Sequence, residues 1–189
     1  MLIRAAEARD ARAIASFISM AESEMVHHFT GTTDPVKSLD ALEKFVMSPV
    51  PNRYSLKNNL VVEEDGKAVA AMMVFPADSQ PDLDGPLLES LNARGYGLDE
   101  LFFEGEPGTF YLSTMGVDPD YRGRGYGSAL LTAAGKVARE KGFTRVSLLV
   151  SKGKPKARAL YERLGFSPLS EVRIGDVDYI RMVKGVSDA

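Results

Sequence analysis

Apolar residues follow two spacings along the chain, and each spacing predicts one kind of element. Stripes with an apolar residue every three to four positions predict amphipathic helices that begin near Asp10, Asp34, Gly125 and Pro155. Short runs rich in β-branched and aromatic residues predict strands at 2–5, 59–64, 68–75, 110–117, 144–150, 166–171 and 177–183. This order predicts an α/β (α+β) fold in which about six or seven strands form a mixed central sheet flanked by about four helices.

Two stretches follow neither spacing. Residues 22–33 are polar and contain His27 and His28. Neighbouring side chains point in different directions, so surface positions are favoured over a shared metal ion or a catalytic base. Residues 76–108 form an acidic insertion before the central strand, with Arg94 as its single basic residue. Within it, Pro86 is expected to begin a short helix that Gly95 ends.

Length, charge and composition narrow the class of protein. The 189 residues suffice for one domain with a sizeable core, which we place at 1–185, followed by a frayed tail at 186–189. The formal net charge of −3 provides no basic face for a nucleic acid. The absence of cysteine excludes a disulfide, a thiolate zinc site and a cysteine nucleophile. The longest apolar run, at 68–75, is too short for a bilayer. We therefore expect a cytoplasmic protein without nucleic-acid or membrane partners.

A glycine-rich turn at 118–125 joins the central strand to a helix. The first turn of a helix carries N–H groups without partners and the positive end of the helix dipole. Glycines at 123, 125 and 127 leave room for an anion, and Arg122 and Arg124 add positive charge. This combination favours a phosphate or diphosphate site over a turn that only packs the helix closely on the sheet. The spacing matches neither a P-loop nor a dinucleotide fingerprint, because Ser128 stands in place of the third glycine.

Two motifs resemble those of the GNAT superfamily of N-acetyltransferases. The first is Arg-x-x-Gly-x-Gly, formed by Arg122, Gly125 and Gly127. The second is Ala-x-x-Leu-Tyr-x-x-x-Gly-Phe at 157–166, one strand and one loop later. The resemblance implies an enzyme that transfers an acetyl group from acetyl-CoA, its cosubstrate, to a primary amine by direct attack in a ternary complex, without a metal. The acceptor would be a small molecule or a peptide, and a homodimer is an expectation at the family level.

The resemblance also assigns roles to residues of this chain. Tyr161 is expected to be the general acid that protonates the leaving thiolate, with a purely core-packing role as the alternative. The strands at 110–117 and 144–150 are expected to diverge and admit the pantetheine arm. The coenzyme is expected to contact Met115, Gly116, Val117, Arg122, Gly123, Arg124, Gly125, Tyr126, Gly127, Ser128, Lys154 and Arg158.

Two positions depart from the family pattern. Lys154 stands where relatives often carry asparagine, and Ser113 stands where some carry a glutamate base. The base is therefore left open among a water relay through Ser113 or Thr114 and the side chains of Glu24, His27 and Glu63. A non-catalytic acyl-CoA-binding or regulatory domain is the alternative function, and a nucleotide-binding or kinase-like module is a weaker third. The insertion at 76–108 is either a lid or wall that attracts a cationic amine, or a solvated acidic loop.

Overall fold

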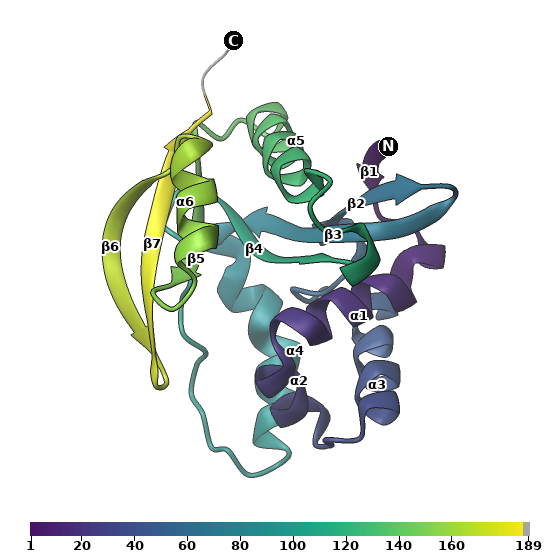
Figure 1. Ribbon diagram of the computed structural model, residues 1–189. Coiled ribbons are helices and arrows are strands. Elements are labelled where there is room, and N and C mark those ends of the chain that lie inside the picture. The colour runs from purple at the N-terminus through teal and green to yellow at the C-terminus, as the bar shows by residue number, and fades with distance from the viewer. Residues whose placement is uncertain (187–189) are drawn as a thin grey trace.

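A seven-stranded mixed sheet forms the centre of the computed structural model, which describes residues 1–186 apart from the side chains of Ser23 and Glu24. The strand order is β1-β2-β3-β4-β5-β7-β6, and β4–β5 is the parallel pair within an otherwise antiparallel arrangement (Figure 1). This confirms the predicted mixed sheet. The strands are β1 (Leu2–Ala5), β2 (Asn59–Glu64), β3 (Lys67–Pro76), β4 (Phe110–Val117), β5 (Arg145–Ser151), β6 (Ser167–Ile174) and β7 (Val177–Gly185).

Six α-helices flank the sheet in the described part of the chain, two more than the approximate number expected. They are α1 (Ala11–Ala21), α2 (Ser23–Thr30), α3 (Pro35–Met47), α4 (Gln80–Asn92), α5 (Tyr126–Glu140) and α6 (Pro155–Arg163).

Helix α2 has no counterpart among the predicted helices, and α4 begins earlier than the short helix predicted within the insertion. In α2 the apolar signal is short, because only Val26 and Phe29 are buried among its described side chains. Helix α4 begins before Pro86, which lies inside it rather than at its start. Proline inside a helix removes one hydrogen bond. Burial of Leu83, Leu87 and Leu91 along one face of α4 offsets that loss.

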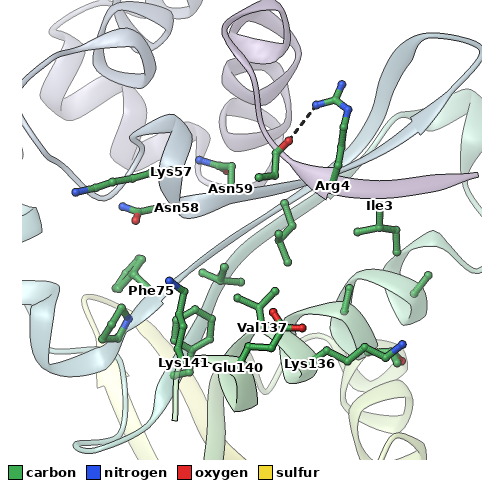
Figure 2. Close-up of a pocket in the computed structure, with 18 of the residues that line it drawn as sticks. Ile3, Arg4, Lys57, Asn58, Asn59, Phe75, Lys136, Val137, Glu140 and Lys141 are labelled. Carbon is green, nitrogen blue, oxygen red and sulfur yellow. Dashed lines mark hydrogen bonds between the residues drawn. The ribbon is translucent and has the colours of Figure 1, made fainter. Parts of the chain in front are cut away.

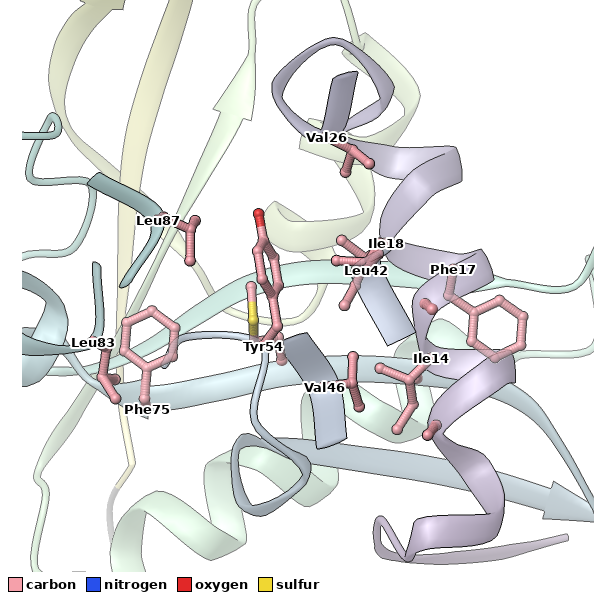
Figure 3. Packing of buried hydrophobic residues seen from close by; sticks show 14 of the residues in the cluster. Ile14, Phe17, Ile18, Val26, Leu42, Val46, Tyr54, Phe75, Leu83 and Leu87 are labelled. Carbon is pink, nitrogen blue, oxygen red and sulfur yellow. The ribbon is translucent and has the colours of Figure 1, made fainter. Parts of the chain in front are cut away.

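The sheet has a separate hydrophobic core on each face. Helices α1 to α4 cover one face, and α5 and α6 cover the other (Figure 1). Figure 3 shows the first core, in which Ile14 and Ile18 of α1 meet Leu42 and Val46 of α3. The 76–108 insertion runs from the end of β3 to just before β4, and its helix α4 adds Leu83, Leu87 and Leu91 to the same core.

Helix α1 lies unusually close to β4 because residue 116 has no side chain. A Cβ built on Gly116 would fall 2.6 Å from the Cβ of Phe17 and 2.9 Å from its carbonyl oxygen. Any larger residue would push the helix away from the strand. This approach sets the end of α1, and therefore Glu22, against the middle of the sheet.

The sheet opens where β4 and β5 diverge. These two strands pair only at Phe110 with Val146 and at Tyr111 with Ser147. Beyond Tyr111, β4 carries an irregularity, because Met72 opposes Met115 whereas Val74 opposes Leu112. The expected divergence is therefore present, and the β5-facing edge of β4 beyond Tyr111 forms no ladder with β5.

Candidate active site

The mouth of α5 presents free backbone donors beside the opening of the sheet. Gly125 is the N-cap of α5, with φ of 82°, and Gly123 has φ of 78°, a region that favours glycine. The first helical bond runs from the Ala129 N–H to the Gly125 carbonyl at 3.0 Å, so the N–H groups of residues 126–128 have no partner inside the helix. A Cβ on Gly123 or Gly125 would meet no atom within 4 Å. The mouth therefore has the donors and the room that an anion requires.

The arginines of the turn contact neighbouring groups rather than the free N–H groups of the helix mouth. Arg122 donates from Nε to the Val117 carbonyl at 3.3 Å. Arg124 lies over the Tyr121 ring, 4.7 Å from its centroid, and its guanidinium is 3.4 Å from Glu64. Both side chains are exposed, and exposed pairs of this kind are weak. A phosphate group could draw either arginine toward the mouth at small cost.

The remaining predicted coenzyme contacts fall into two groups. Met115 packs against the first turn of α5, where a Cβ on Gly127 would be 3.3 Å from the Met115 methyl group. Tyr126 is buried, so only its backbone faces the mouth. The two basic residues of α6 lie apart from this packing. Lys154 is the exposed N-cap of α6, and Arg158 forms a 2.8 Å ion pair with Glu162 one turn along the same helix.

Tyr161 lies on α6, on the same face of the sheet as α5. Its ring packs edge-to-face on Phe166 at 6.0 Å and contributes to the second hydrophobic core. Burial raises the pKa of the Tyr161 phenol, because the charged form loses hydration. The phenol therefore stays protonated at neutral pH and can act as a proton donor.

Glu22 is the site residue that sequence reasoning missed. It joins α1 to α2, and its carboxylate faces β4, where the Thr114 hydroxyl donates a hydrogen bond to it. The Tyr54 hydroxyl donates a second bond at 3.1 Å. Desolvation by burial raises the pKa of Glu22 to about 7, with Arg53 opposing the rise and Glu104 adding to it. A carboxylate with this pKa can accept a proton near neutral pH.

The other candidate bases are placed differently. Glu63 pairs with Arg4 at 2.7 Å and with Arg9 at 3.0 Å, at the β1 edge of the sheet. His28 is exposed, with Nδ1 2.6 Å from the Tyr96 hydroxyl, and His27 is partly exposed nearby. The Glu24 side chain lies outside the described atoms. Thr114 binds Glu22, whereas the buried Ser113 hydroxyl has no hydrogen-bond partner in the described part of the chain.

Several acids of the 76–108 insertion are neutralised internally. The Arg53 guanidinium binds Asp84 through two bonds of 2.5 and 2.6 Å and Glu104 through one of 2.7 Å. Arg53 and Asp84 are both buried. Glu106 lies 3.6 Å from Arg181 of β7. Asp84, Glu104 and Glu106 are therefore not free to attract a cation. Asp82, Asp99 and Glu100 are exposed and keep that role open.

Further hydrogen bonds fix the end of the insertion to α4 and β7. The buried Gln80 amide donates to the Phe102 carbonyl at 2.9 Å and accepts from the Glu104 N–H at 2.9 Å. Arg181 donates to the carbonyls of Phe103 and Glu104 at 3.1 Å each. This part of the insertion is held by a buried polar network, as expected of a wall rather than a moving segment.

A sheet that opens beside a free helix N-terminus is the architecture of an acyl-CoA N-acyltransferase. The Acetyltransferase (GNAT) family matches residues 24–166 of the chain. The protein therefore belongs to the GNAT acetyltransferase family. None of the described helices is long and apolar enough to cross a membrane.

Solved structures agree with this membership. One described as an acetyltransferase superposes with a TM-score of 0.80 at 32% identity, over 99% of this chain and 100% of that one. An N-acetyltransferase from Staphylococcus aureus Mu50 gives a TM-score of 0.83 at 21% identity, over 97% of this chain and 100% of that one, and shows the shared fold.

Curated relatives match over shorter stretches. A mycothiol acetyltransferase of Beutenbergia cavernae is 46% identical over 59 residues, which are 31% of this chain and 20% of that protein. A thialysine N-epsilon-acetyltransferase of Bos taurus is 36% identical over 78 residues, which are 41% of this chain and 46% of that protein. The matches thus span less than half of each of these relatives.

Proposed function

We propose that this protein transfers the acetyl group of acetyl-CoA to a primary amine. The observation that carries the proposal is the free mouth of α5 beside the divergence of β4 from β5. The diphosphate of the coenzyme would bind the N–H groups of residues 126–128. The pantetheine arm would then lie along the unpaired edge of β4, with its amides and thioester carbonyl facing the backbone between Met115 and Val117.

The chemistry requires a proton acceptor for the ammonium and a proton donor for the thiolate, and the two candidates lie on opposite faces of the sheet. The amine arrives as ammonium and loses a proton to the Glu22 carboxylate, directly or through a water held by Thr114. The free amine attacks the thioester carbonyl carbon, a C–N bond forms, and the C–S bond breaks as the tetrahedral intermediate collapses. Tyr161 donates its proton to the departing sulfur, and the second proton that the nitrogen loses as it becomes an amide returns through solvent to the Tyr161 phenolate. A backbone donor on the carbonyl oxygen would contribute on the order of 3 kcal/mol to this step.

A carboxylate at Ser128 is expected to weaken coenzyme binding without destabilising the fold. Ser128 lies in the first turn of α5, where a negative charge favours the helix dipole but repels a diphosphate. We expect Ser128→Glu to lower CoA affinity about tenfold or more, measured by calorimetry, with an unchanged melting temperature. Thr132→Glu, one turn further along α5, is the matched control and should bind CoA normally. Equal affinities in the two variants would place the diphosphate elsewhere.

Loss of the Tyr161 hydroxyl is expected to slow turnover and spare binding. We expect Tyr161→Phe to lower kcat by one or two orders of magnitude, because the thiolate must leave without a proton, with CoA affinity nearly unchanged. The measurement is thiol release from acetyl-CoA across a panel of polyamines, aminoglycosides, amino acids and peptide α-amines. A wild-type kcat in the variant would reject the role of general acid and show that Tyr161 only packs in the core. No release with any amine would favour the non-catalytic acyl-CoA-binding alternative.

The end of the 76–108 insertion is proposed to be a fixed wall of the acceptor site. Its residues 102–106 are bound to Arg53, Gln80 and Arg181, as described above. Asp84, Glu104 and Glu106 are paired there, but Asp82, Asp99 and Glu100 of the same insertion are exposed, so the segment keeps free negative charge. An ammonium group would be attracted to it. A cationic amine, as a small molecule or at a peptide terminus, is therefore the acceptor class we propose.

A further inference from the structure

A large cavity lies on the opposite side of α5 from the opening of the sheet. It has a volume of about 1140 Å³ and is bounded by α5, by β1 and by the adjoining parts of β2 and β3 (Figure 2). Because the strand order is β1-β2-β3-β4-β5, the cavity and the β4–β5 divergence lie on different flanks of the helix. One end of the cavity reaches Gly125 and Ser128 at the N-terminal turn of α5, and the mechanism proposed above uses only that end.

The floor of the cavity is apolar. Its apolar lining includes Ile3, Leu60, Val74, Phe110 and Val137. On α5 the small side chains of Ala129 and Ala133 face the same space, one turn apart. Pockets of several hundred cubic ångströms with apolar walls are typical of small-molecule sites.

The rim of the cavity is positively charged. Lys57, Lys136 and Lys141 are exposed and form no ion pair within the described residues. Glu140 is the single acid of the lining, and Arg4 is neutralised by Asp10 at 2.6 Å and Glu63 at 2.7 Å. Figure 2 shows Lys57 and Lys141 at the same end of the cavity, with Lys136 toward the other end. The rim of the cavity therefore has a net positive charge, and its interior is apolar.

We propose that this cavity binds an amphipathic anion, namely a medium-chain aliphatic carboxylate. The alkyl chain would lie on the floor between α5 and β2, and the carboxylate would lie between Lys57 and Lys141. Burial of the chain supplies affinity that rises with its length, and the lysines select the sign of the charge. Lys57 and Lys141 take no part in the proposed acetyl transfer, so the test of this site uses binding rather than activity.

The test is calorimetric titration of the purified protein with hexanoate, octanoate and decanoate. We expect affinity to rise by up to about fourfold for each added methylene, as for burial of alkyl surface. Decyltrimethylammonium, which has the same chain and the opposite charge, should bind much more weakly. Saturating CoA should leave decanoate binding unchanged, because the diphosphate would lie at the N-terminal turn of α5 and the carboxylate beside Lys141, at the other end of the helix.

Two variants locate the site. Lys57→Gln combined with Lys141→Gln should weaken decanoate binding about tenfold, and Lys44→Gln on the opposite face of the sheet should not. Ala133→Phe should fill the floor and abolish binding while leaving CoA affinity intact. Displacement of decanoate by CoA would place it in the coenzyme channel and overturn the proposal. Absence of decanoate binding, or binding that survives both the lysine variant and Ala133→Phe, would also overturn it.

Discussion

Replacement of Glu22 by glutamine is expected to lower kcat for amine acetylation by about a hundredfold or more. Glutamine keeps the size of the side chain and can still accept the Thr114 hydrogen bond, but it cannot accept a proton from the ammonium. Coenzyme affinity should not change, because Glu22 lies on the α1 face of the sheet, away from the mouth of α5. The measurement is kcat at saturating amine together with calorimetry of CoA.

The pH profile separates a base from a packing residue. With a pKa of about 7, Glu22 loses its base function as the pH falls, so the wild-type kcat should decrease below neutrality. The Glu22→Gln variant should lose this limb. Ionisation of the amine contributes the same slope to both proteins, so the difference between them isolates Glu22. Glu63→Gln is the matched control, and a loss of turnover there instead would transfer the role of base to Glu63.

The same pKa has a consequence for stability. The folded pKa of about 7 lies above the ordinary value of 4.5, so protonated Glu22 stabilises the folded state. That contribution is fully present below pH 4.5 and is lost as the pH rises through 7. Glutamine carries no charge at any pH. The Glu22→Gln variant should therefore melt higher than the wild type at pH 8 and close to it at pH 5, and a difference that is independent of pH would contradict the raised pKa.

Replacement of Arg53 by methionine is expected to lower the free energy of unfolding by about 3–5 kcal/mol. Arg53 is 5% exposed and Asp84 is 4% exposed, so the variant would leave a buried carboxylate without its counterion. Glu104 would lose its 2.7 Å partner as well. Urea denaturation measures the change. Arg9→Met removes an arginine that also pairs with two acids, but at the surface, and should cost less than about 1 kcal/mol.

Arg53 is also expected to tune the proposed base. Its positive charge lowers the pKa of Glu22, and the negative charge of Asp84 raises it. The acid limb of the kcat profile should therefore move to higher pH in Arg53→Met and to lower pH in Asp84→Asn. Shifts of opposite sign cannot arise from lost stability alone. If the pH profiles of both variants coincide with that of the wild type, Arg53 and Asp84 do not influence the group that accepts the proton.

Local features of the site could be predicted because they depend on neighbouring residues. The glycines at 123 and 125 adopt left-handed backbone conformations that few other residues tolerate, so their presence marked the start of α5. The Asp65-Gly66 pair likewise favours the tight turn that joins β2 to β3. At the C-terminal end, Val186 is bound to the Thr144 carbonyl at 2.8 Å, whereas the rest of the predicted tail, 187–189, lies outside the described residues.

Other features were hidden because their sequence signal is weak or mixed. Helix α2 has only a short apolar stripe, and α4 contains a proline that ordinarily begins or ends a helix. The pairing of the acids at 84 and 104 was hidden, because their partner Arg53 precedes them by 31 and 51 residues. Charge counts along a chain do not reveal which charges are paired in space.

The sequence alone determined the order of the strands, the helices that begin near Asp10, Asp34, Gly125 and Pro155, the glycine-rich helix mouth and the family motifs, since each is encoded over a few adjacent residues. Tertiary structure decided which proton acceptor stands beside the central strand. Glu22 meets Tyr54 and Thr114 across separations of 32 and 92 residues, and this meeting depends on α1 packing closely over Gly116. Hydrophobic periodicity specifies which face of an element is buried, but the element that it packs against is chosen by the whole fold.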